Sequence, residues 1–183
     1  MTDVIVVGGG PAGLAAALYT AKNGLETVVY DADDTWMHKA HLFNYLAIES
    51  LDGTEFIERS REQVDGFGAD LREAEVTSLA ETEDGFEVET DSGTEQADFV
   101  VLATGTDRDL AKDVGCAFTD RAVVDVGLTM ETSVDGVYAT GAMVRVEEWQ
   151  AQIAAGDGAA AALNILSTVN GEKFHDFDTP KDA

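Results

Sequence analysis

The hydrophobic pattern begins with a strand that runs directly into a helix. Residues 4–7 (VIVV) are four consecutive β-branched side chains, which is typical of a strand that is buried on both faces. The glycine-rich residues 8–13 follow, and the alanine-rich residues 14–23 predict a helix that ends at Gly24. Residues 26–30 (ETVVY) predict a second strand. This order predicts an α/β fold with a parallel sheet.

The middle of the chain changes from helical spacing to strict alternation. Apolar residues within 54–66 have the spacing of an amphipathic helix. Residues 70–101 then alternate apolar and polar side chains in three short runs, which glycine-containing turns separate. These runs predict a small antiparallel meander that returns into a parallel strand at residues 99–102.

The C-terminal part returns to the α/β pattern. Residues 123–126 (VVDV) predict a short strand, and residues 149–170 predict a long alanine-rich helix. The chain has 183 residues, of which 45% are hydrophobic, so it is long enough to bury one sizeable core. We therefore interpret residues 1–183 as a single domain that ends in a polar tail at residues 171–183.

The glycine-rich turn has the spacing of a dinucleotide-binding motif. Gly8 permits a tight turn, Gly10 lets the backbone approach a pyrophosphate, and Gly13 lets the helix pack against the strand. The free N–H groups of the helix N-terminus favour phosphate. Asp31 follows the second strand, where a carboxylate accepts hydrogen bonds from a ribose. These features predict a dinucleotide site; the alternative is a glycine-rich turn in an α/β domain without a ligand.

Several further motifs occur in a fixed order along nearly the whole chain. They are FNY at 43–45, GTEF at 53–56, ATG at 103–105, TSVDGVYATG at 132–141, and QA followed by AGDGAAAA at 150–162. Together with residues 8–13, they resemble the FAD domain of thioredoxin reductase-like flavoproteins, in the pyridine nucleotide-disulfide oxidoreductase family. The resemblance implies a Rossmann-like FAD-binding fold with a parallel sheet, helices and a small antiparallel β-meander.

The resemblance also implies which residues contact a non-covalently bound FAD. Val76 and the ATG segment would lie near the adenosine, Gly141 and Ala142 near the diphosphate and ribityl chain, and Asn44 near the isoalloxazine. Val76 and Asn44 also fit an ordinary strand valine and turn asparagine. The expected cofactor-binding residues are Gly8, Gly10, Pro11, Ala12, Gly13, Asp31, Asn44, Val76, Ala103, Thr104, Gly105, Gly141, Ala142, Gln150 and Ala151. No residue is assigned a catalytic role.

Two departures from the family pattern concern the ring end of this site. The family usually has Gly-Asp where this chain has Gly141-Ala142, and that aspartate bonds a ribityl hydroxyl. The family's Gly-Gly-Gln-Leu segment is replaced by residues 35–39 (TWMHK), and Asn44-Tyr45 lacks the following Pro-Gly. We therefore expect an intact adenosine half and a rebuilt isoalloxazine half. Four side chains would form either a new wall near the ring or a cover over the core: Trp36, Met37, His38 and His41.

The pyridine-nucleotide domain that two-domain members insert between the halves of the FAD domain is missing. Fewer than 30 residues separate Gly105 from Thr132, and a βαβ unit needs about 30 residues or more. Cys116 is the only cysteine, so a Cys-x-x-Cys pair cannot form. Reduction is therefore expected from an external donor: NAD(P)H, a ferredoxin-like protein or a second subunit. The open flavin face predicts a homodimer or a complex with a partner.

Two classes of function remain at this point. The first is an FAD-dependent oxidoreductase that passes electrons from an external donor to an acceptor and is not a self-sufficient thioredoxin reductase. The alternative is a non-catalytic FAD- or nucleotide-binding module, or a degenerate reductase with a structural or regulatory role. Reduction and reoxidation of bound flavin would separate the two.

The charge balance is strongly acidic, with 36 Asp and Glu against 11 Lys and Arg and a formal net charge of −25. The acids are scattered, which predicts a solvated surface of the haloarchaeal type; a docking face for a basic partner is the alternative. Such a field disfavours nucleic acids and anionic membranes. A single cysteine and the lack of a long apolar segment predict a cytoplasmic protein. His38 and His41 alone do not indicate a metal site.

Overall fold

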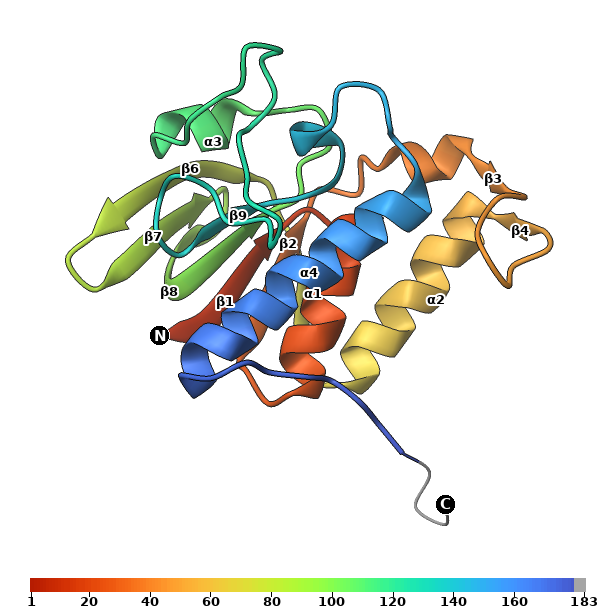
Figure 1. Cartoon of the computed structure of the whole chain (residues 1–183), viewed down its shortest axis with the longest axis horizontal. Coiled ribbons are helices and arrows are strands. Elements are labelled where there is room, and N and C mark those ends of the chain that lie inside the picture. The colour runs from red at the N-terminus through yellow and green to blue at the C-terminus, as the bar shows by residue number, and fades with distance from the viewer. Residues whose placement is uncertain (180–183) are drawn as a thin grey trace.

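Five parallel strands form the sheet that carries the site. The computed structural model describes residues 1–179, and Figure 1 shows the arrangement of the elements. The strands lie in the order β5 (Asp70–Glu73), β2 (Thr27–Asp31), β1 (Thr2–Val7), β8 (Gly93–Leu102) and β9 (Val137–Ala139). Because the strands are parallel, their carboxyl ends meet at one edge of the sheet.

An antiparallel meander extends from β8 and covers one face of the parallel sheet. It consists of β6 (Val76–Thr82), β7 (Gly85–Thr90) and the first half of β8, as the alternating pattern predicted. Leu79 and Phe86 of the meander pack in one core cluster with Ile5, Val7, Val28 and other side chains of the parallel strands. The two types of strand therefore share one hydrophobic core.

The prediction that residues 70–101 form only the meander was wrong at its beginning. Residues 70–73 form β5, which pairs with β2 in parallel, with Val28 opposite Asp70 and Asp31 opposite Glu73. The reason is that β2 has a free hydrogen-bonding edge, and residues 70–73 reach this edge directly after the helix at residues 53–66. Alternation of apolar and polar residues alone does not show whether a strand pairs with β2 or with a strand of the meander.

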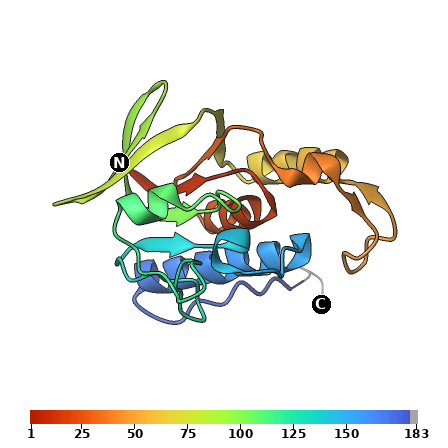
Figure 2. The same ribbon diagram turned by 90° about the horizontal axis from the view of Figure 1, so that it is seen from above.

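Three helices cover the other face of the parallel sheet. They are α1 (Pro11–Lys22), α2 (Gly53–Gly66) and α4 (Ala151–Asn170), and each bound lies within three residues of its prediction. Figures 1 and 2 show α4 lying alongside α1. At their crossing, a Cβ atom on Gly158 would lie 2.0 Å from the carbonyl oxygen of Ala12. Glycine at this position is therefore what allows the two backbones to approach so closely.

The short elements complete the chain between these helices and strands. They are η1 (Trp36–Lys39), β3 (His41–Leu42), β4 (Leu51–Asp52), α3 (Asp109–Asp113) and η2 (Gly141–Val144). The strand predicted at residues 123–126 was wrong. Val124 forms only an isolated bridge with Phe118, and its N–H donates to the carbonyl of Met143 at 3.1 Å, so it does not join the sheet.

The polar tail follows α4 as irregular chain. Its first part, residues 171–179, is described, whereas residues 180–183 of the predicted tail lie outside the described residues. Lys22 on α1 forms ion pairs with Asp176 at 2.6 Å and with Asp178 at 2.5 Å. These contacts hold the tail against the end of α1.

The buried tyrosine of β9 predicts a loss of stability at alkaline pH. The hydroxyl of Tyr138 donates to Asn164 Oδ1 at 2.6 Å, and burial, together with the charge of Glu131, raises the pKa of Tyr138 to about 12. The unfolded tyrosine titrates near pH 10. Since only the unfolded state loses this proton at first, the free energy of unfolding should fall by about 2–3 kcal/mol between pH 10 and pH 12.

Urea unfolding of the wild type and of Tyr138→Phe across pH 9–12 measures this effect. The wild type should lose more stability than the variant over this interval, because a phenylalanine ring has no proton to release. An identical decline of the free energy of unfolding in both proteins would contradict the assignment of this effect to Tyr138.

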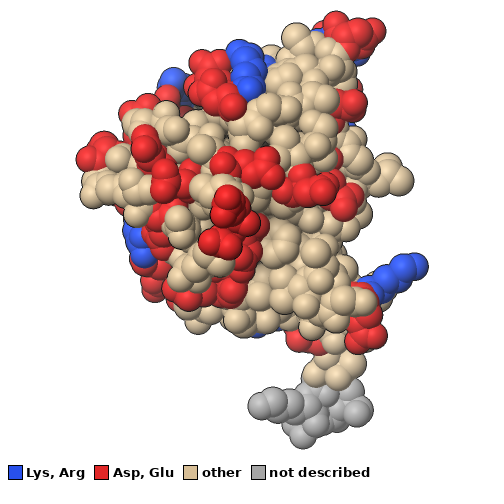
Figure 3. Space-filling model, turned by 90° about the vertical axis from the view of Figure 1, so that its left-hand side faces the viewer, with Lys and Arg blue, Asp and Glu red and all other residues tan. Residues whose placement is uncertain are grey.

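Figure 3 shows the face at the β6–β7 end of the molecule, on which acidic side chains cover far more of the surface than Lys and Arg do. Because these charges repel one another, we expect the thermal midpoint to rise by about 10 °C between 0.1 M and 2 M KCl, as screening shortens the Debye length from about 10 Å to less than 3 Å. The same salt series near the sequence pI of about 4.1 should raise it much less. Equal increases at both pH values would show that charge repulsion is not the cause.

Within residues 1–179, the structure contains no helix of the length and hydrophobicity needed to span a bilayer.

Candidate functional site

A cleft of about 670 Å³ lies at the carboxyl edge of the parallel sheet. Four strands deliver residues to it from their ends, namely Gly8 after β1, Asp31 at the end of β2, Ala103 after β8 and Thr140 after β9. The cleft extends from the start of β6 to the segment before α4. Its volume lies within the range of about 300–1,000 Å³ that is typical of cofactor sites.

The glycine-rich turn forms the floor of the cleft. Gly8 has a φ of +110°, and a Cβ atom there would lie 2.4 Å from the carbonyl oxygen of Ala103, so only glycine allows the turn to contact the end of β8. A Cβ atom on Gly13 would lie 1.9 Å from the carbonyl oxygen of Gly8, which explains the close packing of α1 on the turn. Gly10 is the N-cap of α1 and provides no side chain to satisfy its first N–H groups. These groups remain able to bind an anion.

An ion-pair network surrounds the acid at the end of β2. Arg61 on α2 donates to both Asp31 and Asp33, the latter at 2.6 Å. His38 Nε2 contacts Asp33 Oδ1 at 2.9 Å, and Arg61 and His38 hold the pKa of Asp33 below its ordinary value. The carboxylate of Asp31 lies directly against the glycine turn, since a Cβ atom on Gly9 would be 2.0 Å from Asp31 Oδ2. Arg61 thus fixes the orientation of Asp31.

Thirteen of the fifteen residues expected at the site line this one cleft. They are Gly8, Gly10, Pro11, Ala12, Asp31, Val76, Ala103, Thr104, Gly105, Gly141, Ala142, Gln150 and Ala151. Gly13 instead packs beneath the turn. Asn44 lies beside the cleft, and its Nδ2 donates to Gln150 Oε1 at 2.8 Å. The structure therefore brings together segments from both ends of the chain.

The end of the cleft next to α4 is aromatic. Trp36 and Trp149 both line it, with ring centroids 5.5 Å apart and ring planes at 68°.

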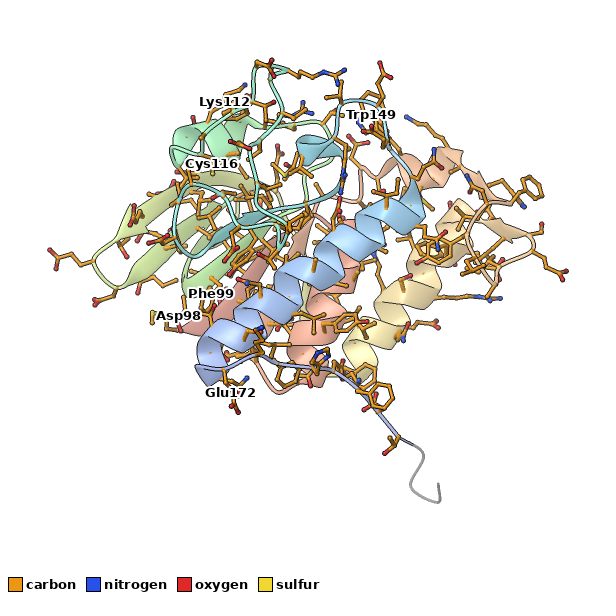
Figure 4. All side chains as sticks on the ribbon, in the orientation of Figure 1. Asp98, Phe99, Lys112, Cys116, Trp149 and Glu172 are labelled. Atoms are coloured by element: carbon orange, nitrogen blue, oxygen red, sulfur yellow. The ribbon has the colours of Figure 1, made fainter. Side chains whose placement is uncertain are left out.

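Met37 also lines the cleft, whereas His38 contacts Asp33 and Thr54 outside it. His41, the fourth residue of the predicted wall or cover, contacts Ser50 at 2.9 Å. Figure 4 shows Trp149 on the loop that precedes α4. Trp149 was not expected in the cleft, because the alanine-rich pattern of residues 149–170 places it as the first residue of the helix.

A single arginine fixes the segment that follows β9. Arg108 donates to the carbonyl oxygens of Met143 at 2.9 Å, Ala142 at 3.1 Å and Thr106 at 2.9 Å. These three bonds tie η2 to the segment after β8. Ala142 presents only a methyl group to the cleft, so the family's usual acidic side chain has no counterpart at this position.

Other reactive groups lie apart from the cleft. Cys116 is buried, and Figure 4 shows it near α3; burial raises the pKa of its thiol. A raised pKa leaves the thiol protonated at neutral pH and poorly nucleophilic. Among residues 1–179, no three His, Cys, Asp or Glu side chains are grouped to hold a metal ion.

The chain is similar in sequence to known proteins. The family described as "Pyridine nucleotide-disulphide oxidoreductase" matches residues 2–105 and 53–158. Thioredoxin reductase of Treponema pallidum is 36% identical over 115 residues, which cover 57% of this chain and 36% of the relative. Ferredoxin–NADP reductase of Levilactobacillus brevis is 25% identical over 166 residues, which cover 86% of this chain and 47% of the relative. The chain thus spans less than half the length of these two relatives.

The fold is also similar to that of solved structures. The atypical thioredoxin reductase TRi from Desulfovibrio vulgaris Hildenborough superimposes with a TM-score of 0.87 at 20% sequence identity. The superposition covers 94% of this chain and 99% of that chain. The predicted α/β, Rossmann-like fold is therefore confirmed.

Proposed function

Because the chain belongs to the pyridine nucleotide-disulphide oxidoreductase family, we propose that it binds FAD in the cleft and passes electrons from an external donor to an acceptor. One observation carries the proposal: thirteen expected cofactor residues, from both ends of the chain, line a single cleft. Bound FAD would supply the redox chemistry through its isoalloxazine ring, and the protein would supply orientation and electrostatics.

The residues of the cleft fit the parts of FAD in order. Val76 and the neighbouring Ala74 and Thr77 line the end next to the meander and suit the adenine. Asp31, which accepts a hydrogen bond from Arg61, would accept further hydrogen bonds from the ribose hydroxyls. The glycine turn and the uncapped N-terminus of α1 suit the diphosphate, because glycine leaves the backbone N–H groups accessible. Gln150 and the N-terminus of α4 lie at the end where the isoalloxazine would bind.

The electron donor is proposed to be external to this chain. Freely diffusing NAD(P)H, a ferredoxin-like protein and a second subunit are the three candidates, and the last also fits a homodimer. Stopped-flow mixing of the FAD-loaded protein with NADH, NADPH or reduced ferredoxin under anaerobic conditions tests them. Loss of flavin absorbance with one donor identifies it, whereas no reduction by any of them favours a second subunit as the donor.

A non-catalytic FAD-binding module is the second candidate function. The observation that favours it is Ala142, which lines the cleft at the position where the family usually has an aspartate. A module of this kind would bind FAD, but its flavin would leave the protein on reduction or fail to reoxidise. Filtration of the reduced protein, followed by exposure to oxygen, distinguishes this candidate from an electron-transfer protein.

Arg61 provides a test of the ribose site with a matched control on the same helix. We expect Arg61→Ala to weaken FAD binding roughly 3- to 10-fold, because Asp31 loses the ion pair that orients it. Arg59→Ala removes an exposed ion pair with Glu55 one turn apart and should change affinity less than about 2-fold. Calorimetric titration with FAD at fixed salt compares them. Equal affinities of the Arg61→Ala variant and the wild type would contradict the role of Arg61.

A further inference from the structure

Both tryptophans of the chain lie at one end of the cleft. The sequence contains only two, Trp36 on η1 and Trp149 just before α4, and their rings meet edge to face with centroids 5.5 Å apart. Both rings remain largely exposed, with 55% of Trp36 and 45% of Trp149 accessible to water. A pair of large aromatic side chains that is exposed inside a cleft is available to bind a ligand.

The side chain of Trp149 and the backbone next to Trp36 are both anchored. The Nε1–H of Trp149 donates to the carbonyl of Arg145 at 3.2 Å, and Arg145 is itself tied to Asp157 of α4 by an ion pair at 2.5 Å. Trp36 is followed by the buried Met37, whose N–H donates to Thr35 Oγ1. The pair is therefore positioned before any ligand arrives, which reduces the entropy lost on binding.

Polar groups lie directly beside this aromatic pair. Gln150 follows Trp149 in the chain, and its side-chain oxygen accepts a hydrogen bond from Asn44. Gln150 occupies the N-cap position of the 20-residue helix α4, but no side chain accepts from the first N–H groups of this helix. An aromatic surface next to a polar edge suits a planar heteroaromatic ring with hydrogen-bonding atoms on one side. The adenine half of the cleft, near Val76, lies at its other end.

We propose that Trp36 and Trp149 form an aromatic wall that binds the isoalloxazine ring of FAD and shields it from solvent; this inference rests on the proposed function. Flat contact with one ring and edge contact with the other would use the observed angle of 68° between their planes. The wall would then contribute to affinity for FAD but not for ADP, which contains the adenosine and diphosphate without the flavin ring.

Titrations of tryptophan variants with FAD and with ADP test this inference. Trp36→Leu and Trp149→Leu should each weaken FAD binding about 3- to 10-fold and leave ADP binding unchanged. The emission of bound flavin should increase in the double variant, because contact with indole quenches it. Trp149→Phe keeps an aromatic ring and should recover most of the affinity. Phe67→Leu, at an exposed phenylalanine just after α2, should leave both affinities unchanged.

The possible outcomes separate this inference from the function on which it rests. Selective loss of FAD affinity together with brighter flavin emission supports the wall. Unchanged FAD affinity and emission in the double variant, or equal losses for FAD and ADP, overturn the wall but not FAD binding. A wild-type protein that binds neither FAD nor ADP overturns the proposed function and the wall with it.

Discussion

Gly158→Ala should destabilise the protein by about 3 kcal/mol, which corresponds to a fall of about 6–12 °C in the thermal midpoint. The added methyl group would lie 2.0 Å from the carbonyl oxygen of Ala12 and 3.1 Å from the backbone nitrogen of Ala16. Backbone atoms of a packed helix cannot move aside without separating α1 from α4. The same separation would displace the N-termini of both helices, which flank the cleft.

Gly156→Ala is the matched control for this prediction. Gly156 lies on the same helix and is exposed, and a Cβ atom there meets nothing within 4 Å. Alanine is the better helix former, so this variant should be more stable than the wild type by about 0.5–1 kcal/mol. Thermal unfolding of both variants measures the difference. Two variants that shift in the same direction would contradict the close helix contact.

Asp31→Ala should weaken FAD binding about 10- to 100-fold. The variant loses charge-assisted hydrogen bonds to the ribose hydroxyls, each worth about 1.5–3 kcal/mol when buried. FMN lacks the adenosine and should bind the variant and the wild type with similar affinity. The FAD-to-FMN affinity ratio from parallel titrations is therefore the readout.

Asp34→Ala provides the control for Asp31→Ala. Asp34 also lines the cleft but is exposed to solvent, so its removal should change FAD affinity less than about 2-fold. A loss of FAD affinity that is equal in the two variants would show that the effect is one of general charge. It would contradict a specific ribose contact at Asp31.

The fold was predictable wherever the sequence pattern has one structural solution. Four β-branched residues before a glycine turn, followed by an alanine-rich helix, specified β1 and α1, and turns at Gly85 and Gly93 specified the meander. Residues 123–126 have the same apolar character as β1. Their backbone N–H groups instead donate to carbonyl groups of η2 and of the irregular segment around residue 117. Pairing partners of this kind are decided by tertiary packing.

The lining of the candidate cleft was predictable where it depends on the backbone and not where it depends on long side chains. Glycine spacing and strand ends located the cleft, because both are local properties. The contact of Arg61 with Asp31 joins two elements 30 residues apart, and the helical pattern of α2 does not reveal which residue its side chains meet. The pairing of Trp36 with Trp149 spans most of the chain for the same reason. In both cases the contact forms between segments that only the folded chain brings together, so no local sequence pattern predicts it.

The measurement that tests the central claim most directly is an absorbance spectrum of the protein purified in molar salt and supplemented with FAD, followed by anaerobic dithionite and then oxygen. We predict flavin absorbance that remains with the protein after gel filtration, bleaches on reduction and recovers on reoxidation without release of the cofactor. A protein that shows no flavin absorbance after incubation with FAD and gel filtration would contradict the assignment of the cleft as a flavin site.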